Sequence, residues 1–238
     1  GQDYCGELVQ FDPAEGYGYV DQLMLGETSD NQYRSWMSRH AAMMIEYATA
    51  YVACKAADWP LGNGGPLGLL DMSEANGALP GTSIGQPAHP PGTHTDGHDM
   101  DVAYYQAETP DNLLRPICDH EVEGVESYHC VAAPHLLDPW RTALFIGALQ
   151  EHPDLRVIGC DGKAGPALSD ALEVLCDVGW LSAAACNNPS LTWEESNQGY
   201  GWFLLHHANL HVSFHSPSIS CDPSCEGKTC GDDGCGGT

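Results

Sequence analysis

The apolar positions of the chain first predict a helix between Asn31 and Lys55. Apolar side chains recur there every three or four residues, and Asp30 precedes the run as an N-cap. The predicted stripe consists of Trp36, Met43, Met44, Tyr47, Ala48 and Tyr51.

Two further helices are predicted in the second half of the chain. The first covers residues 138–150, where Asp138 is the expected cap and Pro139 takes the first helical position. The second covers residues 166–178 and is amphipathic. Its apolar stripe consists of Leu168, Leu172, Leu175 and Cys176.

Three segments have the pattern of short strands, namely residues 100–105, 155–160 and 210–214. In the last, Leu210, Val212 and Phe214 alternate with His211, Ser213 and His215. This is the period of a strand with one buried face. Helices and strands are mixed without a regular βαβ repeat, so the predicted fold class is α+β. We expect a small antiparallel sheet, flanked by helices and long loops, to carry the functional site.

The segment between Asp58 and Gly97 differs from its surroundings. It is rich in glycine, proline and small polar residues. A loop of this length inside a compact domain is unusual unless it builds a site. We therefore expect the part from Gly62 to Gly92 to line a cleft.

Composition indicates one globular domain with a short appendage. The chain has 238 residues, of which 42% are hydrophobic. No run approaches the roughly 18 apolar residues of a membrane-spanning helix. The formal net charge is −25, with only eight Lys and Arg residues, and this argues against a nucleic-acid partner, which requires basic side chains.

The eleven cysteines indicate an oxidising compartment. Cys118 with Cys130 and Cys176 with Cys186 are the preferred local disulfides, and the odd total leaves at least one thiol without a partner in these residues. We expect a secreted, periplasmic or cell-surface protein. The start at Gly1 is typical of a mature chain whose signal peptide has been removed, or of a trimmed one.

The predicted domain covers residues 1–217, and residues 218–238 differ from it. Four cysteines in this tail lie among Gly, Asp, Ser and Lys, with almost no apolar residues: Cys221, Cys225, Cys230 and Cys235. The tail is predicted to be a disulfide-containing linker or the start of a stalk. A zinc knuckle is the alternative.

Two histidine clusters predict a metal centre. The first contains His89, His94 and His98, and the second contains His206, His207, His211 and His215. His94 and Asp101 are seven positions apart with Gly97 between them, so the chain can fold back and present both side chains to one ion. His211 on its strand would be the third ligand. Two imidazoles and one carboxylate leave a fourth position open, as in catalytic zinc sites.

Two alternatives remain for this chemistry. Asp96, Asp99 and Asp101 could bind calcium, which favours oxygen ligands, although the nearby histidines favour zinc. Nucleophilic catalysis has less support, because no serine lies in a Gly-x-Ser-x-Gly turn and no cysteine has the context of a reactive thiolate.

At these residues the chain resembles the penicillin-insensitive murein endopeptidases, in the zinc metallopeptidase superfamily of lysostaphin, D-Ala-D-Ala peptidases and the hedgehog fold. The segment from Thr93 to Val102 resembles their Ser/Thr-His-x-x-Gly-x-Asp-x-Asp motif, and residues 71–81 resemble the approach to it. The segment from His206 to Val212 is similar to the C-terminal motif, which is shorter and less specific. The resemblance covers roughly residues 61–214.

The resemblance implies zinc-dependent cleavage of peptidoglycan cross-links, such as D-Ala to diaminopimelate. His207, or failing that His206, would be the general base, because Asn209 stands where the family has a histidine. An amide cannot take a proton, so a metal-containing binding module without catalysis is one alternative. A carboxypeptidase or dipeptidase of the same superfamily is another. Other peptide substrates also remain possible, because an acidic chain gains no attraction toward anionic peptidoglycan.

Overall fold

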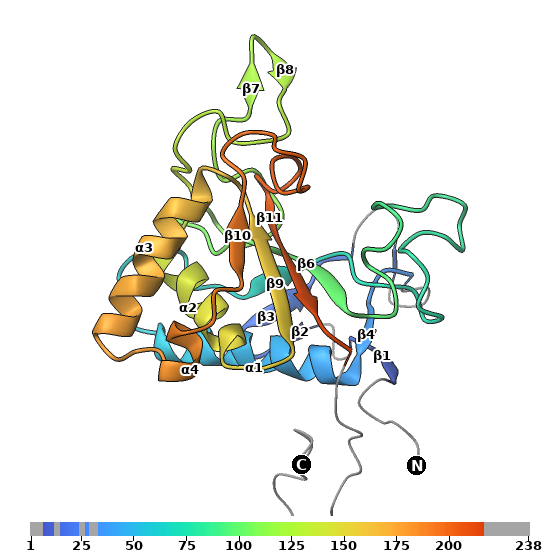
Figure 1. The fold of residues 1–238 in the computed structure, drawn as a ribbon, viewed down its shortest axis with the longest axis horizontal. Coiled ribbons are helices and arrows are strands. Elements are labelled where there is room, and N and C mark those ends of the chain that lie inside the picture. Colours follow the sequence, from blue (N-terminus) through green and yellow to red (C-terminus); the bar gives the residue numbers. More distant parts are fainter. Residues whose placement is uncertain (1–6, 12–14, 24–26, 29–32, 217–238) are drawn as a thin grey trace, which may run out of the picture.

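The protein is built around a mixed seven-stranded sheet with helices gathered on one side of it (Figure 1). A computed structural model describes residues 7–11, 15–23, 27–28 and 33–216. The helices in this part are α1 (Arg39–Lys55), α2 (Pro139–Gln150), α3 (Ala164–Asp177) and α4 (Ala183–Cys186). The strands are β1 (Leu8–Gln10), β2 (Glu15–Gly16), β3 (Tyr19–Asp21), β4 (Trp36–Ser38), β5 (Leu67–Leu69), β6 (Asp99–Ala103), β7 (Glu121–Val122), β8 (Val125–Glu126), β9 (Leu155–Cys160), β10 (Leu191–Trp193) and β11 (Asn209–Phe214).

The strand order of the main sheet is β10-β9-β11-β6-β5-β3-β2. Most neighbours are antiparallel, while β10 with β9 and β3 with β5 are parallel. The predicted α+β class is therefore confirmed, with a larger sheet than expected. The two central strands, β6 and β11, pair so that His211 lies directly opposite Asp101.

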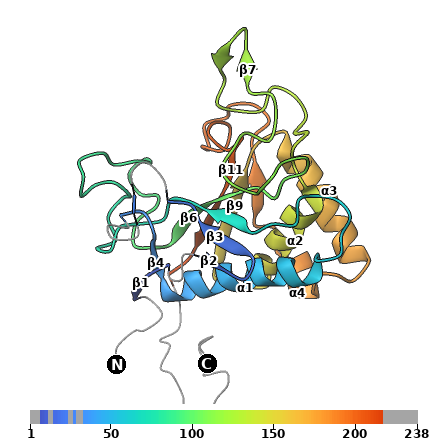
Figure 2. The same cartoon turned by 180° about the vertical axis from the view of Figure 1, so that it is seen from behind.

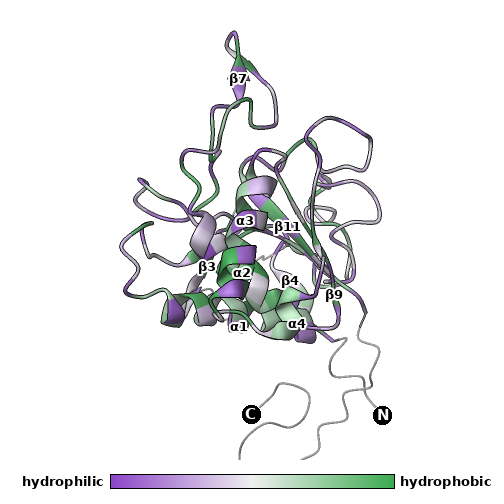
Figure 3. Ribbon diagram, turned by 60° about the vertical axis from the view of Figure 1, so that its left-hand side comes forward, coloured by the Kyte–Doolittle hydropathy of each residue, from purple (hydrophilic) through white to green (hydrophobic). Residues whose placement is uncertain are grey.

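The two faces of this central pair differ in character. Met100 and Val102 on β6, with Leu210 and Val212 on β11, belong to the buried core that the helices cover. Because side chains alternate along a strand, Asp99, Asp101 and His211 lie on the opposite face. Coloured by hydropathy, the helices are most apolar where they meet one another and the sheet (Figure 3). The sheet thus separates an apolar core from a polar face.

The first predicted helix begins later than expected. It starts at Arg39 with Ser38 as its N-cap, whereas Trp36–Ser38 forms β4 and pairs with β1. Asp30, the predicted cap, lies outside the described residues. The buried side of α1 consists mainly of small or branched residues: Ala41, Ala42, Ile45, Ala48, Thr49 and Val52. Tyr47, predicted to be part of the apolar stripe, is exposed. Pairing with a strand distant in sequence takes Trp36 out of the helix.

The strand predicted at 210–214 is observed as β11, but both of its faces are buried. The expected solvent-exposed face is instead covered by the residues of the polar site and by Trp202, whose ring lies 5.8 Å from that of His211. Burial of a polar strand face requires partners for its polar groups. The burial of this face indicates that its polar residues form an organised site rather than a solvent-exposed surface.

The remaining predicted elements agree closely with the structure. Asp138 caps α2 by accepting hydrogen bonds from the amides of Trp140 and Arg141, both at 3.1 Å. Helix α3 starts two residues before its predicted first residue, and β9 has its predicted bounds. The long Gly- and Pro-rich segment contains the short strand β5. Its part before β6 extends beyond the sheet on the side away from α3 (Figures 1 and 2).

Both predicted disulfides, Cys118–Cys130 and Cys176–Cys186, are present. Within the described part of the chain, Cys54 and Cys160 are free thiols. The cysteines of the predicted tail lie outside the described residues. None of the helices in the described ranges is long and apolar enough to cross a membrane.

The carboxyl group of Asp21 on β3 is buried, so the stability of the protein should depend on its protonation. Its Oδ2 atom is buried and has no hydrogen-bond partner among the described residues. Burial and the neighbouring charge of Glu27 raise the pKa of Asp21 from 3.8 to about 7, which the hydrogen bond of Ser35 only partly offsets. The folded protein therefore binds this proton more tightly than the unfolded chain, and its stability falls as the pH rises from about 4 to about 7.

Replacing Asp21 with asparagine is expected to raise the free energy of unfolding above pH 7 by on the order of 2 kcal/mol. At pH values below the usual carboxyl pKa the gain should disappear. Urea denaturation of both proteins at the two pH values measures the effect, with the same change at the exposed Asp58 as a control. An equal gain at both pH values would contradict a protonation effect.

Candidate metal centre

The structure brings together the three predicted ligands, His94, Asp101 and His211. The Nε2 atom of His94 lies 3.2 Å from Nδ1 of His211 and 3.4 Å from Oδ1 of Asp101. The third side of this triangle, from His211 Nδ1 to Asp101 Oδ1, is 3.2 Å. His94 and His211 are 117 positions apart in the sequence and meet because β6 and β11 are paired.

These spacings fit a tetrahedral zinc ion. With zinc–ligand bonds of about 2.0–2.2 Å, two ligand atoms of a tetrahedral site are about 3.3–3.6 Å apart. All three distances lie within about 0.2 Å of that range. The ligand atoms would therefore need little movement to hold an ion of this kind.

The other ring nitrogen of each histidine already has a partner. His94 Nδ1 lies 3.0 Å from the backbone oxygen of Asp71, so this nitrogen carries the hydrogen and Nε2 keeps its lone pair. His211 Nε2 lies 3.1 Å from Oδ1 of Asp99, which leaves Nδ1 for a metal. Partners of this kind fix the ring orientation and the tautomer of metal-binding histidines. Sequence reasoning gave Asp71 no role in the site and considered Asp99 only as a calcium ligand.

Asp99 is itself held in place. Its Oδ1 accepts a hydrogen bond from Arg156, which also donates to Ser213 Oγ at 2.8 Å.

Changing Asp99 to asparagine is expected to weaken zinc binding by about 10–100-fold, because the partner that orients His211 loses its charge. Competition with a chromophoric chelator measures the affinity. The same change at Asp96, exposed in the same motif, should leave it unaltered; an unaltered affinity in the Asp99 variant would remove its orienting role.

A further histidine completes one side of the site. The ring of His89 is stacked on that of His94, with centroids 3.8 Å apart. Its Nε2 lies 2.7 Å from Oδ2 of Asp71 and 3.9 Å from Oδ2 of Asp101. Arg34 forms an ion pair with the other oxygen of Asp71. The membership of His89 in the first histidine cluster was the only sequence signal for this contact.

The backbone of the motif is tightly folded. Gly97 has φ of 67°, and a Cβ atom there would lie 2.4 Å from the amide nitrogen of Ser38. His94 and Asp96 also adopt left-handed conformations, with φ of 50° and 55°. Such conformations cost roughly 1 kcal/mol or more for residues other than glycine, and they are concentrated at functional sites. The turn directs His94 back toward β6.

The charges of the site are strongly coupled. Burial opposes ionisation of Asp101, yet the neighbouring imidazoles of His94 and His211 outweigh it and hold the pKa of Asp101 well below its usual range. Burial also lowers the pKa of His211, but hydrogen bonds with Asp101 and Asp99 outweigh this and raise it to about 9. Without a metal, His211 therefore carries a proton that a divalent cation would displace.

The two predicted catalytic histidines face different neighbours. The ring centroid of His206 lies 6.5 Å from that of His211 and 5.4 Å from that of Trp202. His207 instead contacts His120, with centroids 5.2 Å apart, and its Nε2 lies 3.8 Å from Oε1 of Glu126. Of the pair, His206 is the one with a ring contact to a predicted ligand.

A loop organised by Glu194 covers the site. Its buried carboxylate accepts hydrogen bonds from the backbone amides of Gln198, Tyr200, Trp202 and Phe203. Trp202 then packs on Gly159, which is opposite His211 in the sheet. A Cβ atom at Gly159 would lie 2.1 Å from the Trp202 ring. A cavity of about 270 Å³ adjoins this loop and is lined in part by Lys163, Glu194 and Phe203.

The calcium alternative has less support from these contacts. Asp99 and Asp101 both bond to His211, and Asp96 is exposed in the preceding turn. Imidazoles at the centre of the site favour a zinc-type ion, because calcium prefers an all-oxygen shell.

The chain matches no known protein-family model and no curated protein. Its likeness to the murein endopeptidases therefore depends on the motif residues themselves.

Proposed function

We propose that the protein is a zinc-dependent hydrolase of peptide bonds that acts outside the cytoplasm. The observation that carries this proposal is the spacing of 3.2–3.4 Å among His94 Nε2, Asp101 Oδ1 and His211 Nδ1. Three protein ligands leave one tetrahedral position for solvent or substrate, which is typical of catalytic rather than structural zinc. When bound, zinc supplies a water of lowered pKa and polarises a carbonyl.

His206 is the general base in this proposal. Its Nδ1 atom lies 2.8 Å from the backbone oxygen of Leu204, so Nδ1 carries the hydrogen and Nε2 offers a lone pair. Burial lowers the pKa of His206, although the charge of Asp101 opposes this, and the ring is neutral at neutral pH. The buried Tyr104 donates a hydrogen bond to the backbone oxygen of His206 at 2.9 Å and fixes its position.

The proton path follows from this placement. His206 Nε2 would accept a proton from the attacking water as its oxygen bonds to the carbonyl carbon. The same nitrogen would return the proton to the amine as the carbon–nitrogen bond breaks. General acid–base catalysis of this kind contributes about 10²–10⁴-fold. Asn209 shares the strand face of His211, where its amide could hydrogen-bond to the substrate.

The substrate that the motif residues favour is a peptide cross-link of peptidoglycan. Support comes from the resemblance of residues 93–102 to the murein endopeptidase motif. The two disulfides support the extracytoplasmic location, because such bonds persist in oxidising compartments.

The test is incubation of the purified chain with defined muropeptides, with and without a chelator. Conversion of cross-linked dimers to monomers, lost on chelation and restored by zinc, is the expected result. Loss of terminal D-Ala alone would instead identify a carboxypeptidase. Unchanged muropeptides in the presence of zinc would contradict hydrolysis of this substrate.

Asn209 favours one second candidate, a metal-containing binding module. It is buried at the start of β11, where the family motif has a histidine. Retention of muropeptides by the zinc-loaded protein without cleavage would support that function.

A further inference from the structure

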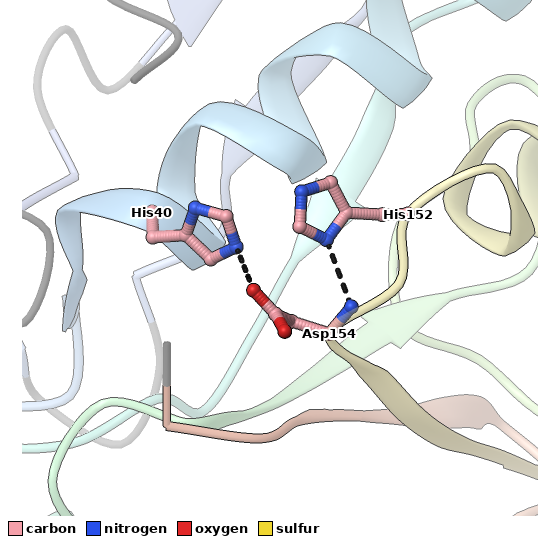
Figure 4. Close-up of side chains that lie close together, drawn as sticks. All are labelled: His40, His152 and Asp154. Atoms are coloured by element: carbon pink, nitrogen blue, oxygen red, sulfur yellow. Dashed lines mark hydrogen bonds and ion pairs between the residues drawn. The ribbon is translucent and has the colours of Figure 1, made fainter. Parts of the chain in front are cut away.

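A second group of metal-binding side chains lies away from the proposed zinc centre. His40 belongs to the first turn of α1, while His152 and Asp154 belong to the turn between α2 and β9. One potential ligand atom from each lies within 4.8 Å of those of the other two. The ring of His40 is directed toward the carboxylate of Asp154, and that of His152 toward its backbone nitrogen (Figure 4).

The ring of His40 has an unusual environment. Its Nε2 is buried and forms no hydrogen bond within the described part of the chain, although it lies only 3.2 Å from Oδ2 of Asp154. A buried polar atom that makes no hydrogen bond is costly to the folded protein. A cation between this nitrogen and the carboxylate oxygen would satisfy both, and their separation is close to the edge of a tetrahedral zinc site, about 3.3 Å.

His152 brings an unprotonated ring nitrogen close to Asp154. The backbone amide of Asp154 donates to its Nδ1 at 3.2 Å, so this nitrogen is the unprotonated one (Figure 4). Its ring centroid lies 4.4 Å from that of His40.

From these contacts we infer that His40, His152 and Asp154 form a second site for a divalent transition metal, zinc being the first choice. Imidazole suits zinc, nickel and copper, whereas calcium and magnesium prefer oxygen. The ion would take the Nδ1 lone pair of His152 in place of the weak amide contact. It would link the start of α1 to the entry of β9 independently of any hydrolysis.

This link lies next to a structurally important turn. Ser38, the cap of α1, donates from its amide to the backbone oxygen of Gly97 at 3.0 Å. His215, just after β11, donates from its amide to the backbone oxygen of Asp154 at 2.7 Å. A metal here would therefore stabilise α1, the turn before β6 and the end of β11 together.

The test is the zinc content of the full chain after equilibration at buffered free zinc, measured by mass spectrometry of the metal. The wild type is expected to hold two equivalents. His211→Ala and His152→Ala should each hold one, and the double variant should hold none. Asp154→Asn should also hold one and keeps the size of the side chain. His135→Ala, at an exposed histidine outside these groups, should hold two.

A thermal melt provides an independent measurement. Zinc should raise the melting temperature of His211→Ala, and this shift should be lost in His211→Ala/Asp154→Asn. One equivalent in the wild type that disappears in His211→Ala would overturn the second site and leave the proposed catalytic centre intact. One equivalent that disappears only in His152→Ala would overturn the catalytic centre and leave the second site intact.

Discussion

Replacing His211 with alanine is expected to remove the zinc of the proposed catalytic centre and nearly all hydrolysis. The ring nitrogen Nδ1 supplies one corner of the ligand triangle, at 3.2 Å from both neighbouring ligand atoms. The two ligands that remain, His94 and Asp101, would bind zinc far more weakly. Loss of the several kcal/mol that a catalytic metal contributes, about 4 kcal/mol, corresponds to a fall of about 10³-fold in kcat/KM.

The matched control is His215→Ala, four residues farther along the chain at an exposed position. It should retain the wild-type zinc content and activity. Metal analysis and muropeptide turnover are measured on the same preparations, and circular dichroism verifies folding. Retention of all zinc in the His211 variant would remove this residue as a ligand and with it the proposed centre.

Replacing His206 with glutamine is expected to lower kcat by about 10²–10⁴-fold without loss of zinc. Glutamine keeps a hydrogen-bonding side chain but cannot accept a proton at neutral pH. The retained metal separates this effect from that of the ligand variant. Steady-state kinetics and zinc content are the two measurements.

His207→Gln is the informative comparison for this prediction. His207 contacts His120 and Glu126, so its replacement should leave kcat close to that of the wild type. A large fall in kcat for His207→Gln with a small one for His206→Gln would restore the preference that the sequence alone suggested. Equal, small effects in both would indicate that neither is the general base.

Local interactions explain which parts of the fold were predictable. Asp138 followed by Pro139 fixes the start of α2 through contacts within one helical turn. The two disulfides close loops with separations of 12 and 10 residues, so their partners are near neighbours in any compact arrangement. The start of α1 was wrong because pairing between β1 and β4 is not local.

The surroundings of His206 and His207 could not be predicted from the sequence for a different reason. Adjacent residues direct their side chains to different neighbours, so the orientation depends on the contacts of the whole loop. Here Tyr104 fixes the backbone of His206, and the amide of Leu205 donates to the backbone oxygen of Tyr128. Neither contact leaves a signal in the local sequence.

The fold class, the two disulfide pairs and the three side chains that meet at the proposed metal centre could all be predicted from the sequence. Those features depend on side-chain chemistry and short-range periodicity, which can be recognised in the local sequence. Only the tertiary structure decided that Asp71 and Asp99 orient the two imidazoles and that His40 meets His152 and Asp154. Such pairs form because the sheet and helices pack segments distant in sequence side by side, and no local pattern encodes that proximity.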